Sequence, residues 1–177
     1  MECETNQQCD KLTKSIIAYR ETVFQVALGY VKNIHDADDI AQNVFLKLCN
    51  HKKAFISPEA EKAWLIRVAI NEAKDLLGSA WKRNQSSFDE SFGVPFSVND
   101  EDLSVYEYVK KLKPKYRTVI YLHYFEGYST KEIAVILKMT QSAVTTQLSR
   151  ARNQLKEDIT QDNKEVNSSF GKLQKLI

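Results

Sequence analysis

Apolar residues in the first part of the chain recur at helical spacing. From Thr13 to Val31 they fall three or four positions apart, which predicts a helix with one buried face. Asn33-Ile34-His35 interrupts this pattern, and Asp36 is expected to cap a second helix that starts there. The apolar residues expected to form the core face of the second helix are Ile40, Val44, Phe45 and Leu48.

A loop and a third helix are predicted next. His51 to Glu61 has no helical period, and Pro58 is its conformationally restricted point. From about Ala63 to Trp81 the apolar residues again recur at helical spacing. The stripe of this third helix consists of Leu65, Val68, Ala69, Leu76 and Leu77. Residues 10–84 are therefore expected to form one small helical domain.

The second half of the chain predicts another helical domain. Residues 85–100 hold serine, glycine and proline without helical periodicity, which is typical of a linker. Four short helices are then expected at residues 103–112, 115–125, 130–137 and 141–156, within a domain of residues 101–157 and before a polar tail at 158–177. The predicted fold class is all-α, with two small helical domains joined by a flexible acidic linker and a C-terminal domain that is a four-helix helix-turn-helix.

The last two of these helices have the pattern of a DNA-binding helix-turn-helix. Ser129-Thr130-Lys131-Glu132 has the sequence of a capping box, which predicts a helix start. Lys138-Met139-Thr140 is a short break, with Met139 as an apolar contact between the helices. In the final helix the residues expected to face inward are Val144, Leu148, Ala151 and Leu155.

The opposite face of the final helix is polar or basic and has no carboxylate before Glu157. Short hydroxyl side chains permit close approach to the major groove, a threonine methyl can contact a thymine methyl, and arginine can bind guanine or phosphate. A helical hairpin with a solvated outer face is the alternative, but such faces usually mix both signs of charge. The residues predicted to contact DNA are Gln141, Ser142, Thr145, Thr146, Ser149, Arg150 and Arg152.

Charge is distributed unevenly along the chain. The net charge is only +2. Between Asn84 and Tyr108, however, there is no lysine, arginine or histidine, whereas several carboxylates occur there. The chain is therefore basic, then acidic, then basic, which indicates basic surfaces in both domains that the net charge conceals.

Composition excludes several classes of protein. Charged residues make up 27% of the chain, and no apolar run approaches the roughly 20 residues that cross a membrane, so no membrane insertion is expected. The N-terminus lacks the pattern of a secretory signal, which predicts a cytoplasmic protein with reduced cysteines. The spacing of Cys49 and His51 fits no zinc motif, and no cofactor is expected. Because the three histidines lie in unrelated contexts and no phosphate-binding glycine loop occurs, an enzyme is not expected.

Two separate sets of motifs carry a family resemblance. The run from Leu112 to Ala134, closing with Leu148-Ser149-Arg150-Ala151-Arg152, resembles the C-terminal domain of bacterial RNA polymerase sigma factors, specifically the extracytoplasmic-function group. The run from Asp36 to Lys47 resembles the helix with which these factors bind core polymerase. The run from Trp64 to Asp75 resembles the helix that melts the promoter −10 element. The resemblance covers residues 13–157, with both domains in the family's order.

The resemblance implies roles for individual residues. The matching exposed positions of the core-binding helix are Asp38, Asp39, Gln42, Asn43 and Lys47. In the family a flipped −10 base enters a pocket beside a loop, which would be His51 to Glu61 here. The residues implied in −10 binding are Trp64, Arg67, Asn71 and Lys74, with Lys82 and Arg83 on phosphates.

Alternatives stay open for some of these residues. Trp64 can stack on a base or simply pack in the core, because Leu65 and Val68 neighbour it. The acidic linker can imitate nucleic acid in the polymerase cleft or serve as a solvated tether. A calcium loop starting at Asp36 is excluded, because Ala41 and Lys47 stand where glycine and glutamate would be needed.

The resemblance predicts a sigma factor that binds core RNA polymerase and recognises promoter −10 and −35 DNA, under control of an anti-sigma factor. The alternative is a stand-alone helix-turn-helix regulator, which would have no use for a polymerase-docking helix.

The chain also departs from the family. Thr145 and Gln147 stand where basic residues are frequent, Asn43 where an acidic one is frequent, and Lys138 where glycine is frequent. The recognition helix is therefore expected to bind DNA weakly by itself.

Overall fold

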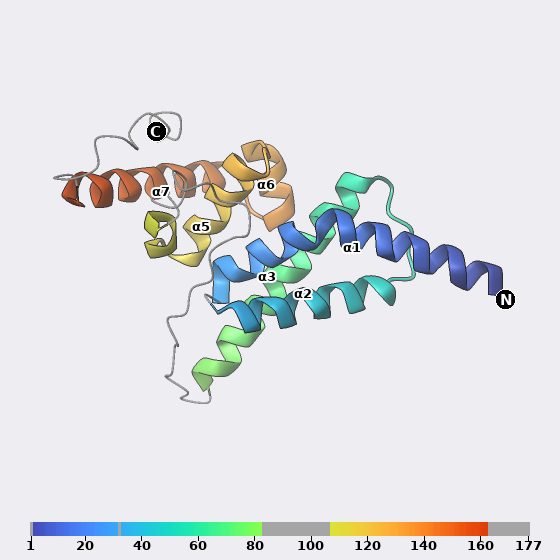
Figure 1. Ribbon diagram of the computed structural model, residues 1–177. Helices are drawn as coiled ribbons and strands as arrows, with labels where there is room; N and C mark the ends of the chain where they lie inside the picture. The colour runs from blue at the N-terminus through green and yellow to red at the C-terminus, as the bar shows by residue number, and fades with distance from the viewer. Residues whose placement is uncertain (1, 32, 83–106, 163–177) are drawn as a thin grey trace. The chain divides into compact units, whose positions relative to one another are not determined.

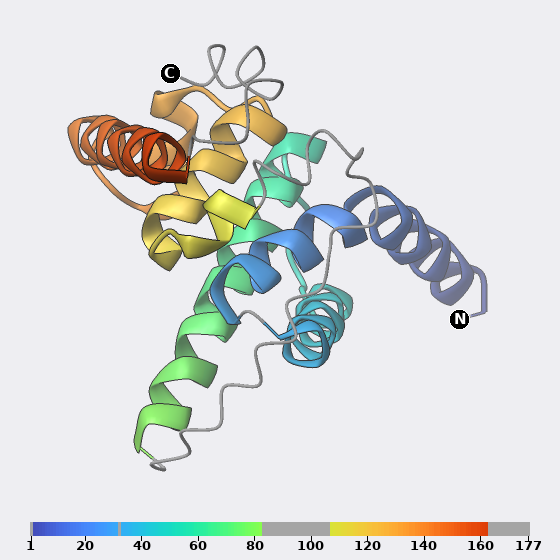
Figure 2. The same cartoon turned by 60° about the vertical axis from the view of Figure 1, so that its left-hand side comes forward.

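The computed structural model describes residues 2–31, 33–82 and 107–162, and all regular structure in these ranges is helical. In the first unit α1 (Glu2–Val31), α2 (Ile34–Cys49) and α3 (Pro58–Lys82) each contact the other two. Figure 1 shows α2 running alongside α1, and Figures 1 and 2 both show α3 crossing α1. The linker at 85–100, Arg83 and residues 163–177 lie outside the described residues.

The second unit contains the predicted helix-turn-helix. It consists of a short helical stretch at residues 107–111, α5 (Pro114–Ile120), the π-helical segment η1 (Tyr121–Phe125), α6 (Thr130–Leu137) and α7 (Gln141–Asp162). Both α5 and α6 pack on α7, and η1 contacts both α5 and α6. The predicted all-α class with two small helical domains is confirmed. Within the described residues, no helix combines the length and apolar character that a membrane crossing needs.

The predicted apolar stripes supply only part of the core of the first unit. On α3 the predicted residues Val68, Leu76 and Leu77 are half-buried, whereas Ile66, Ile70 and Ala73, which were not predicted, are buried. Val23 of α1, Val44 of α2 and Leu65 of α3 are all 0% exposed. Each such residue stabilises the fold by roughly 1.5–3 kcal/mol relative to an exposed position. The stripes therefore determine which face of each helix is turned inward and which is left to solvent.

The start of α2 differs from the prediction. Asn33, not Asp36, is the capping residue, and its side-chain oxygen accepts a hydrogen bond from the backbone N–H of His35 at 2.8 Å. The apolar pattern did not reveal this start because Ile34, the first helical residue, is 40% exposed and does not join the core. Asp36 lies in the first turn instead, where its charge interacts favourably with the helix dipole.

The predicted loop at His51 to Glu61 is shorter than expected, because α3 begins at Pro58. Proline suits the first helical position, where its missing N–H costs nothing, and the hydroxyl of Ser57 accepts a hydrogen bond from the N–H of Ala60 at 3.2 Å. Glu61 is thereby placed inside the helix. It is only 7% exposed and accepts a hydrogen bond from the hydroxyl of Ser15 at 2.6 Å, which connects α3 to α1.

Two other helices extend beyond their predicted ends. The first helix begins at Glu2 rather than Thr13. The last helix continues to Asp162 rather than ending at Lys156, and Ile159, 6% exposed, extends its buried stripe by another step of four residues from Leu155. The sequence stretch 115–125, predicted as one helix, is divided into α5 and η1.

The start of α6 confirms the predicted capping box. The hydroxyl of Ser129 accepts a hydrogen bond from the N–H of Glu132 at 3.3 Å, and the N–H of Ser129 donates to the Glu132 carboxylate at 2.8 Å. The hydrogen bond from the Ser129 side chain, followed by the one from its backbone, lowers the pKa of Glu132. Since the ionised carboxylate is the form that accepts both bonds, the box is complete at neutral pH.

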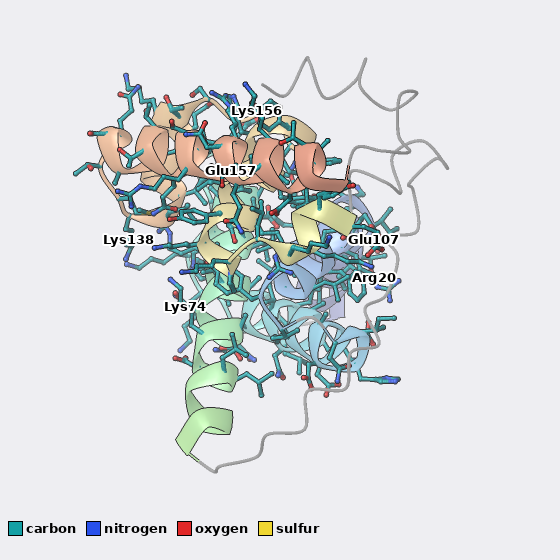
Figure 3. All side chains as sticks on the ribbon, turned by 90° about the vertical axis from the view of Figure 1, so that its left-hand side faces the viewer. Arg20, Lys74, Glu107, Lys138, Lys156 and Glu157 are labelled. Carbon is teal, nitrogen blue, oxygen red and sulfur yellow. The ribbon has the colours of Figure 1, made fainter. Side chains whose placement is uncertain are left out.

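The turn between α6 and α7 places a lysine in an unusual backbone conformation. Lys138, exposed in this turn (Figure 3), has φ 52° and ψ 49° and caps the C-terminus of α6. It is the one non-glycine residue with positive φ among the described residues. The left-handed region costs a side chain with a Cβ about 1–2 kcal/mol, and glycine avoids that cost. The departure from glycine noted in the sequence therefore carries a backbone strain.

Replacing Lys138 by glycine is expected to stabilise the second unit by up to about 1 kcal/mol, because the relief of backbone strain exceeds the added entropy of the unfolded chain. The change in the free energy of unfolding is measured by urea titration and by hydrogen exchange of the α7 core amides. Lys131→Gly, inside α6, is the matched control and is expected to destabilise by about 1 kcal/mol. Equal destabilisation by both variants would contradict the strain argument.

Candidate functional sites

The outer face of α7 is exposed as predicted. Val144, Leu148 and Ala151 are buried against the other helices of the unit, which turns the opposite side of the helix to solvent. Among the described side chains of α7, no carboxylate occurs on this surface before Glu157. The residues predicted to contact DNA that are exposed are Gln141, Ser142, Thr145, Thr146, Ser149 and Arg150.

The hydroxyl groups on this face are oriented by the helix itself. Thr145 donates its hydroxyl hydrogen to the carbonyl oxygen of Gln141 at 3.0 Å, and Thr146 donates to that of Ser142 at 2.9 Å. The γ-methyl groups and the remaining oxygen lone pairs are then what both threonines offer to a partner. The side-chain amide of Gln141 donates to the hydroxyl of Thr130 at 3.1 Å, so the start of α7 is tied to α6.

The two arginines of α7 have different surroundings. Arg152 is half-buried, its Nε donates to the hydroxyl of Tyr124 at 2.7 Å, and its guanidinium carbon lies 5.6 Å from the centre of that ring. Arg152 thus belongs to the contact between α7 and η1, which differs from its predicted place on the exposed face. Arg150 is exposed and donates a hydrogen bond to the hydroxyl of Tyr116 in α5, and this bond is the main reason why the pKa of Tyr116 is lowered.

The outer face of α2 presents a second polar surface. Asp39, Gln42 and Asn43 are exposed, as predicted. Leu46 lies on the same face, one turn after Gln42 and Asn43, and is 61% exposed. It was not among the predicted site residues, although it stands outside the inward stripe of α2 and could have been recognised on that ground. An exposed leucine within a polar face is a common feature of protein-binding surfaces.

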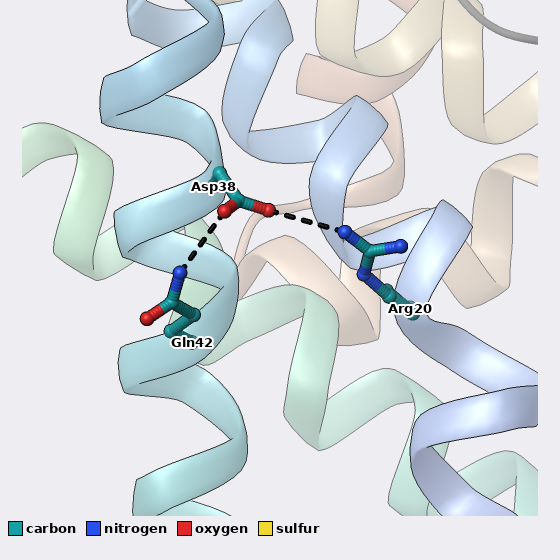
Figure 4. Close-up of polar contacts among 3 residues, drawn as sticks. All are labelled: Arg20, Asp38 and Gln42. Atoms are coloured by element: carbon teal, nitrogen blue, oxygen red, sulfur yellow. Dashed lines mark hydrogen bonds and ion pairs between the residues drawn. The ribbon is translucent and has the colours of Figure 1, made fainter.

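Two charged residues of α2 are engaged with neighbouring helices. Asp38 accepts hydrogen bonds from Arg20 of α1 at 3.3 Å and from Gln42 at 3.0 Å, as Figure 4 shows. Lys47 forms an ion pair with Glu72 of α3. Of the five residues predicted to bind polymerase, Asp38, Gln42 and Lys47 therefore have partners within the protein, whereas Asp39 and Asn43 are exposed.

One face of α3 carries the residues predicted to contact the −10 element. Trp64, Arg67, Asn71 and Lys74 follow one another at steps of three, four and three, which places them on one side of the helix. Asn71 and Lys74 are exposed, and Trp64 and Arg67 are half-buried (Figure 3 labels Lys74). The side chain of Lys82, at the end of α3, and the whole of Arg83 lie outside the described residues.

Trp64 packs on the loop before α3 rather than in the helical core. Its ring lies 4.8 Å from that of His51 and 5.6 Å from that of Phe55, and the His51 and Phe55 rings are stacked at 4.6 Å. The indole is half-buried against these two rings, and its stacking on a base stays a prediction. The aromatic cluster gives the loop a defined conformation.

A cavity of about 500 Å³ adjoins this loop. Its lining includes the basic residues Lys11, Lys52 and Lys53, the aromatic ring of Phe55, and the buried carboxylate of Glu61. Lysines suit a phosphate group, and an aromatic ring suits a base. Among the described residues, no group of three or more histidine, cysteine, aspartate or glutamate side chains is placed to hold a metal ion.

A helix-turn-helix with a carboxylate-free outer face, together with a separate three-helix unit that has polar faces of its own, defines a DNA-binding transcription protein of two domains. The profile of Sigma-70 region 2 matches residues 16–83, and that of Sigma-70 region 4 matches residues 102–155. The chain belongs to the sigma-70 family and is an RNA polymerase sigma factor of the extracytoplasmic-function group.

Individual relatives agree with this assignment. The chain is 27% identical over 154 residues to the RNA polymerase sigma factor SigV of Bacillus subtilis, covering 85% of this chain and 92% of that one. It is 26% identical over 169 residues to the extracytoplasmic-function factor SigW of the same organism, covering 85% and 89%. The fold is similar to that of the sigma factor RpoE of Bartonella quintana, solved in complex with the anti-sigma factor NepR, with a TM-score of 0.69 at 21% identity over 83% of this chain and 95% of that one.

The contact between Arg150 and Tyr116 predicts a titration. Arg150→Ala is expected to raise the pKa of Tyr116 toward its ordinary value of 10.0, because the largest cause of its lowering is removed. At neutral pH the phenol is protonated in both the folded and the unfolded chain, so the lowered pKa does not affect stability there. At alkaline pH the lowered pKa stabilises the folded parent protein, and the Arg150→Ala variant lacks this contribution. Nuclear magnetic resonance of labelled tyrosines measures the pKa.

Arg152→Ala is the control for this titration, because Arg152 contacts Tyr124 instead of Tyr116. It is expected to leave the pKa of Tyr116 where it is in the parent protein. An unchanged pKa of Tyr116 in the Arg150→Ala variant would show that the guanidinium is not held on this hydroxyl in solution.

Proposed function

We propose that this sigma factor binds core RNA polymerase through the outer face of α2, recognises the promoter −10 element with α3 and the adjoining loop, and recognises the −35 element with α7. The observation that carries the proposal is the outer face of α7, which is exposed, polar or basic, and free of carboxylates from Gln141 to Lys156. A helix of this kind, preceded by a capped helix and a tight turn, is suited to the major groove.

The proposed polymerase contact is supported by the composition of the α2 face. Asp39, Gln42 and Asn43 surround the exposed Leu46, so an apolar side chain lies within a polar rim. Protein interfaces commonly have this arrangement, in which the apolar residue supplies affinity and the polar residues supply orientation. Since α2 is held from behind by α1 and α3, this face is presented on a rigid support.

The proposed −10 contact is supported by three neighbouring features. The exposed polar side chains of Asn71 and Lys74 continue along α3 from the half-buried Trp64. The cavity beside the loop combines lysines with an aromatic ring. Stacking on such a ring stabilises a base taken out of the duplex by about 1–3 kcal/mol. This is comparable to the cost of unstacking one base-pair step.

We further propose that the protein acts in the cytoplasm and that an anti-sigma factor controls it. The supporting observation is that both RpoE of Bartonella quintana and CnrH, which share this fold, were solved in complex with an anti-sigma factor or the cytosolic domain of CnrY. An anti-sigma factor that covers the α2 face would compete directly with the polymerase.

Transcription with purified components tests the proposal. Core polymerase, the protein and a promoter library are combined, and the transcripts are sequenced to find the start sites and the shared upstream elements. We expect specific transcripts only when protein and core are both present. If the protein produces no specific transcript and does not comigrate with core on size exclusion, its role as a sigma factor is refuted.

The proposed contact of α2 with core polymerase predicts that substitutions on its outer face reduce holoenzyme formation. Asp39→Asn combined with Gln42→Ala is expected to weaken core binding by at least roughly tenfold, because two polar contacts at one interface are lost. Titration of labelled protein with core, followed by fluorescence anisotropy, measures the affinity. The matched control is Asp10→Asn on α1, which also removes one carboxylate from an exposed position of the first unit. Unchanged core affinity in the double variant would remove α2 from the interface.

The exposed threonines of α7 predict that the −35 sequence is recognised partly through contacts between methyl groups. Thr145→Ser removes the methyl and keeps the hydroxyl, whereas Thr145→Val keeps the methyl. If Thr145 contacts a thymine, holoenzyme binding to its −35 element should weaken by about 0.8 kcal/mol in the serine variant, because one methyl contact is lost. Arg150→Ala should weaken it by about 1–3 kcal/mol if the arginine binds a base. Replacing the −35 thymines by deoxyuridine should weaken the parent protein and not the serine variant. Identical responses of both proteins to deoxyuridine would contradict a methyl contact.

A further inference from the structure

A polar network joins α1 to the proposed docking face of α2. The Asp38 carboxylate uses one oxygen, Oδ1, to accept from Nη2 of Arg20 at 3.3 Å and the other, Oδ2, to accept from Nε2 of Gln42 at 3.0 Å. Figure 4 shows Asp38 between the two partner side chains, with Arg20 reaching across from α1. Neither Arg20 nor this arrangement was anticipated from the spacing of residues in the sequence.

The network contributes little to holding the two helices together. The side chains of Arg20 and Asp38 are 67% and 40% exposed, and ion pairs at that exposure are weakened by solvent and salt. The two helices pack on each other and both bury apolar residues, Val23 and Ala27 on α1 and Ala37 and Ile40 on α2. The main effect of the network is therefore on the orientation of its side chains.

The orientation of the Gln42 amide follows from the chemistry of its partner. An ionised carboxylate can only accept hydrogen bonds, so the amide must turn its NH₂ group toward Asp38. The carbonyl oxygen of Gln42 then points away from Asp38 and is the atom offered to a partner. Without Arg20 the Asp38 carboxylate would be free to change rotamer, and the Gln42 amide would lose its fixed direction.

We propose that Arg20 is a positioning residue for polymerase docking: it holds Asp38, and Asp38 holds Gln42 with its carbonyl oxygen outward, ready to accept an N–H from the polymerase. This inference rests on the proposed docking function of α2. It assigns Asp38 an orienting role rather than a direct contact, since both of its oxygens already have partners inside the protein.

A double-mutant cycle on core binding tests the pathway from Arg20 to Asp38. Arg20→Ala and Asp38→Ala are each expected to weaken core binding by roughly three- to tenfold, and the double variant no further than the larger single effect. Additive losses would mean that Arg20 acts independently of Asp38, which would overturn the inference. Lys14→Ala is the control, because it removes a positive charge from an exposed position of the same helix and should leave the affinity unchanged.

A second experiment tests the direction of the amide itself. In Asp38→Asn the introduced amide can still accept from Arg20, but it now donates to Gln42 and turns that side chain around. Core affinity is expected to fall as in Asp38→Ala. Adding Gln42→Glu should restore most of the loss, because a carboxylate at that position accepts from the introduced amide and again offers an oxygen outward. If the combined variant stays as weak as Asp38→Asn alone, the amide orientation is not the cause.

The measurements separate this inference from the proposed docking function. If Gln42→Ala leaves core binding unchanged, the docking function of this face fails. If Gln42→Ala weakens core binding and Arg20→Ala does not, only the positioning role fails. Thermal unfolding of each variant, followed by circular dichroism, is expected to match that of the parent protein because the three residues are solvent-accessible. A variant with weakened binding and a matching unfolding curve therefore reports on docking.

Discussion

Burial of a single apolar stripe on each helix is the constraint on which the other features of this protein depend. On α2 the inward residues Ala37, Ile40, Ala41 and Val44 are at most 4% exposed. On α7 a corresponding stripe runs from Val144 to Ile159. Because a helix has only one opposite side, burying these stripes turns the polar residues of α2 and α7 to solvent together. The proposed polymerase contact and the proposed −35 contact both depend on this orientation of the two helices.

The exposed faces are also organised by contacts among their own side chains. Arg152 is held on Tyr124, Lys47 on Glu72, and Asp38 between Arg20 and Gln42. Such contacts reduce the number of conformations that must be lost on binding, so they favour association even when they add little to stability. A factor that exchanges between polymerase, DNA and an inhibitory partner benefits from surfaces whose geometry is prepared in advance.

The sequence predicted the helices well where local pattern and local chemistry agree. The start of α6 at Thr130 and that of α7 at Gln141 were both predicted, because a capping box and a short polar break mark them. Predictions were less accurate where the capping residue stood outside the apolar pattern. Asn33 caps α2 ahead of an exposed isoleucine, and Ser57-Pro58 begins α3 within a stretch without helical periodicity. The division between α5 and η1 has no comparable mark in the residues.

Periodicity and residue type determined the all-α class, the two domains and the chemical character of each exposed face, since these depend on residues near one another in the chain. Only the tertiary structure decided which polar side chains remain available. Arg152 lies within the helical span that carries Arg150, yet Arg152 is half-buried and donates a hydrogen bond to Tyr124 of η1, whereas Arg150 stays exposed. Arg20 joins the proposed docking face because α1 lies against α2, at a separation of 18 residues. Contacts between segments distant in sequence depend on how helices pack, and local pattern carries no record of that packing.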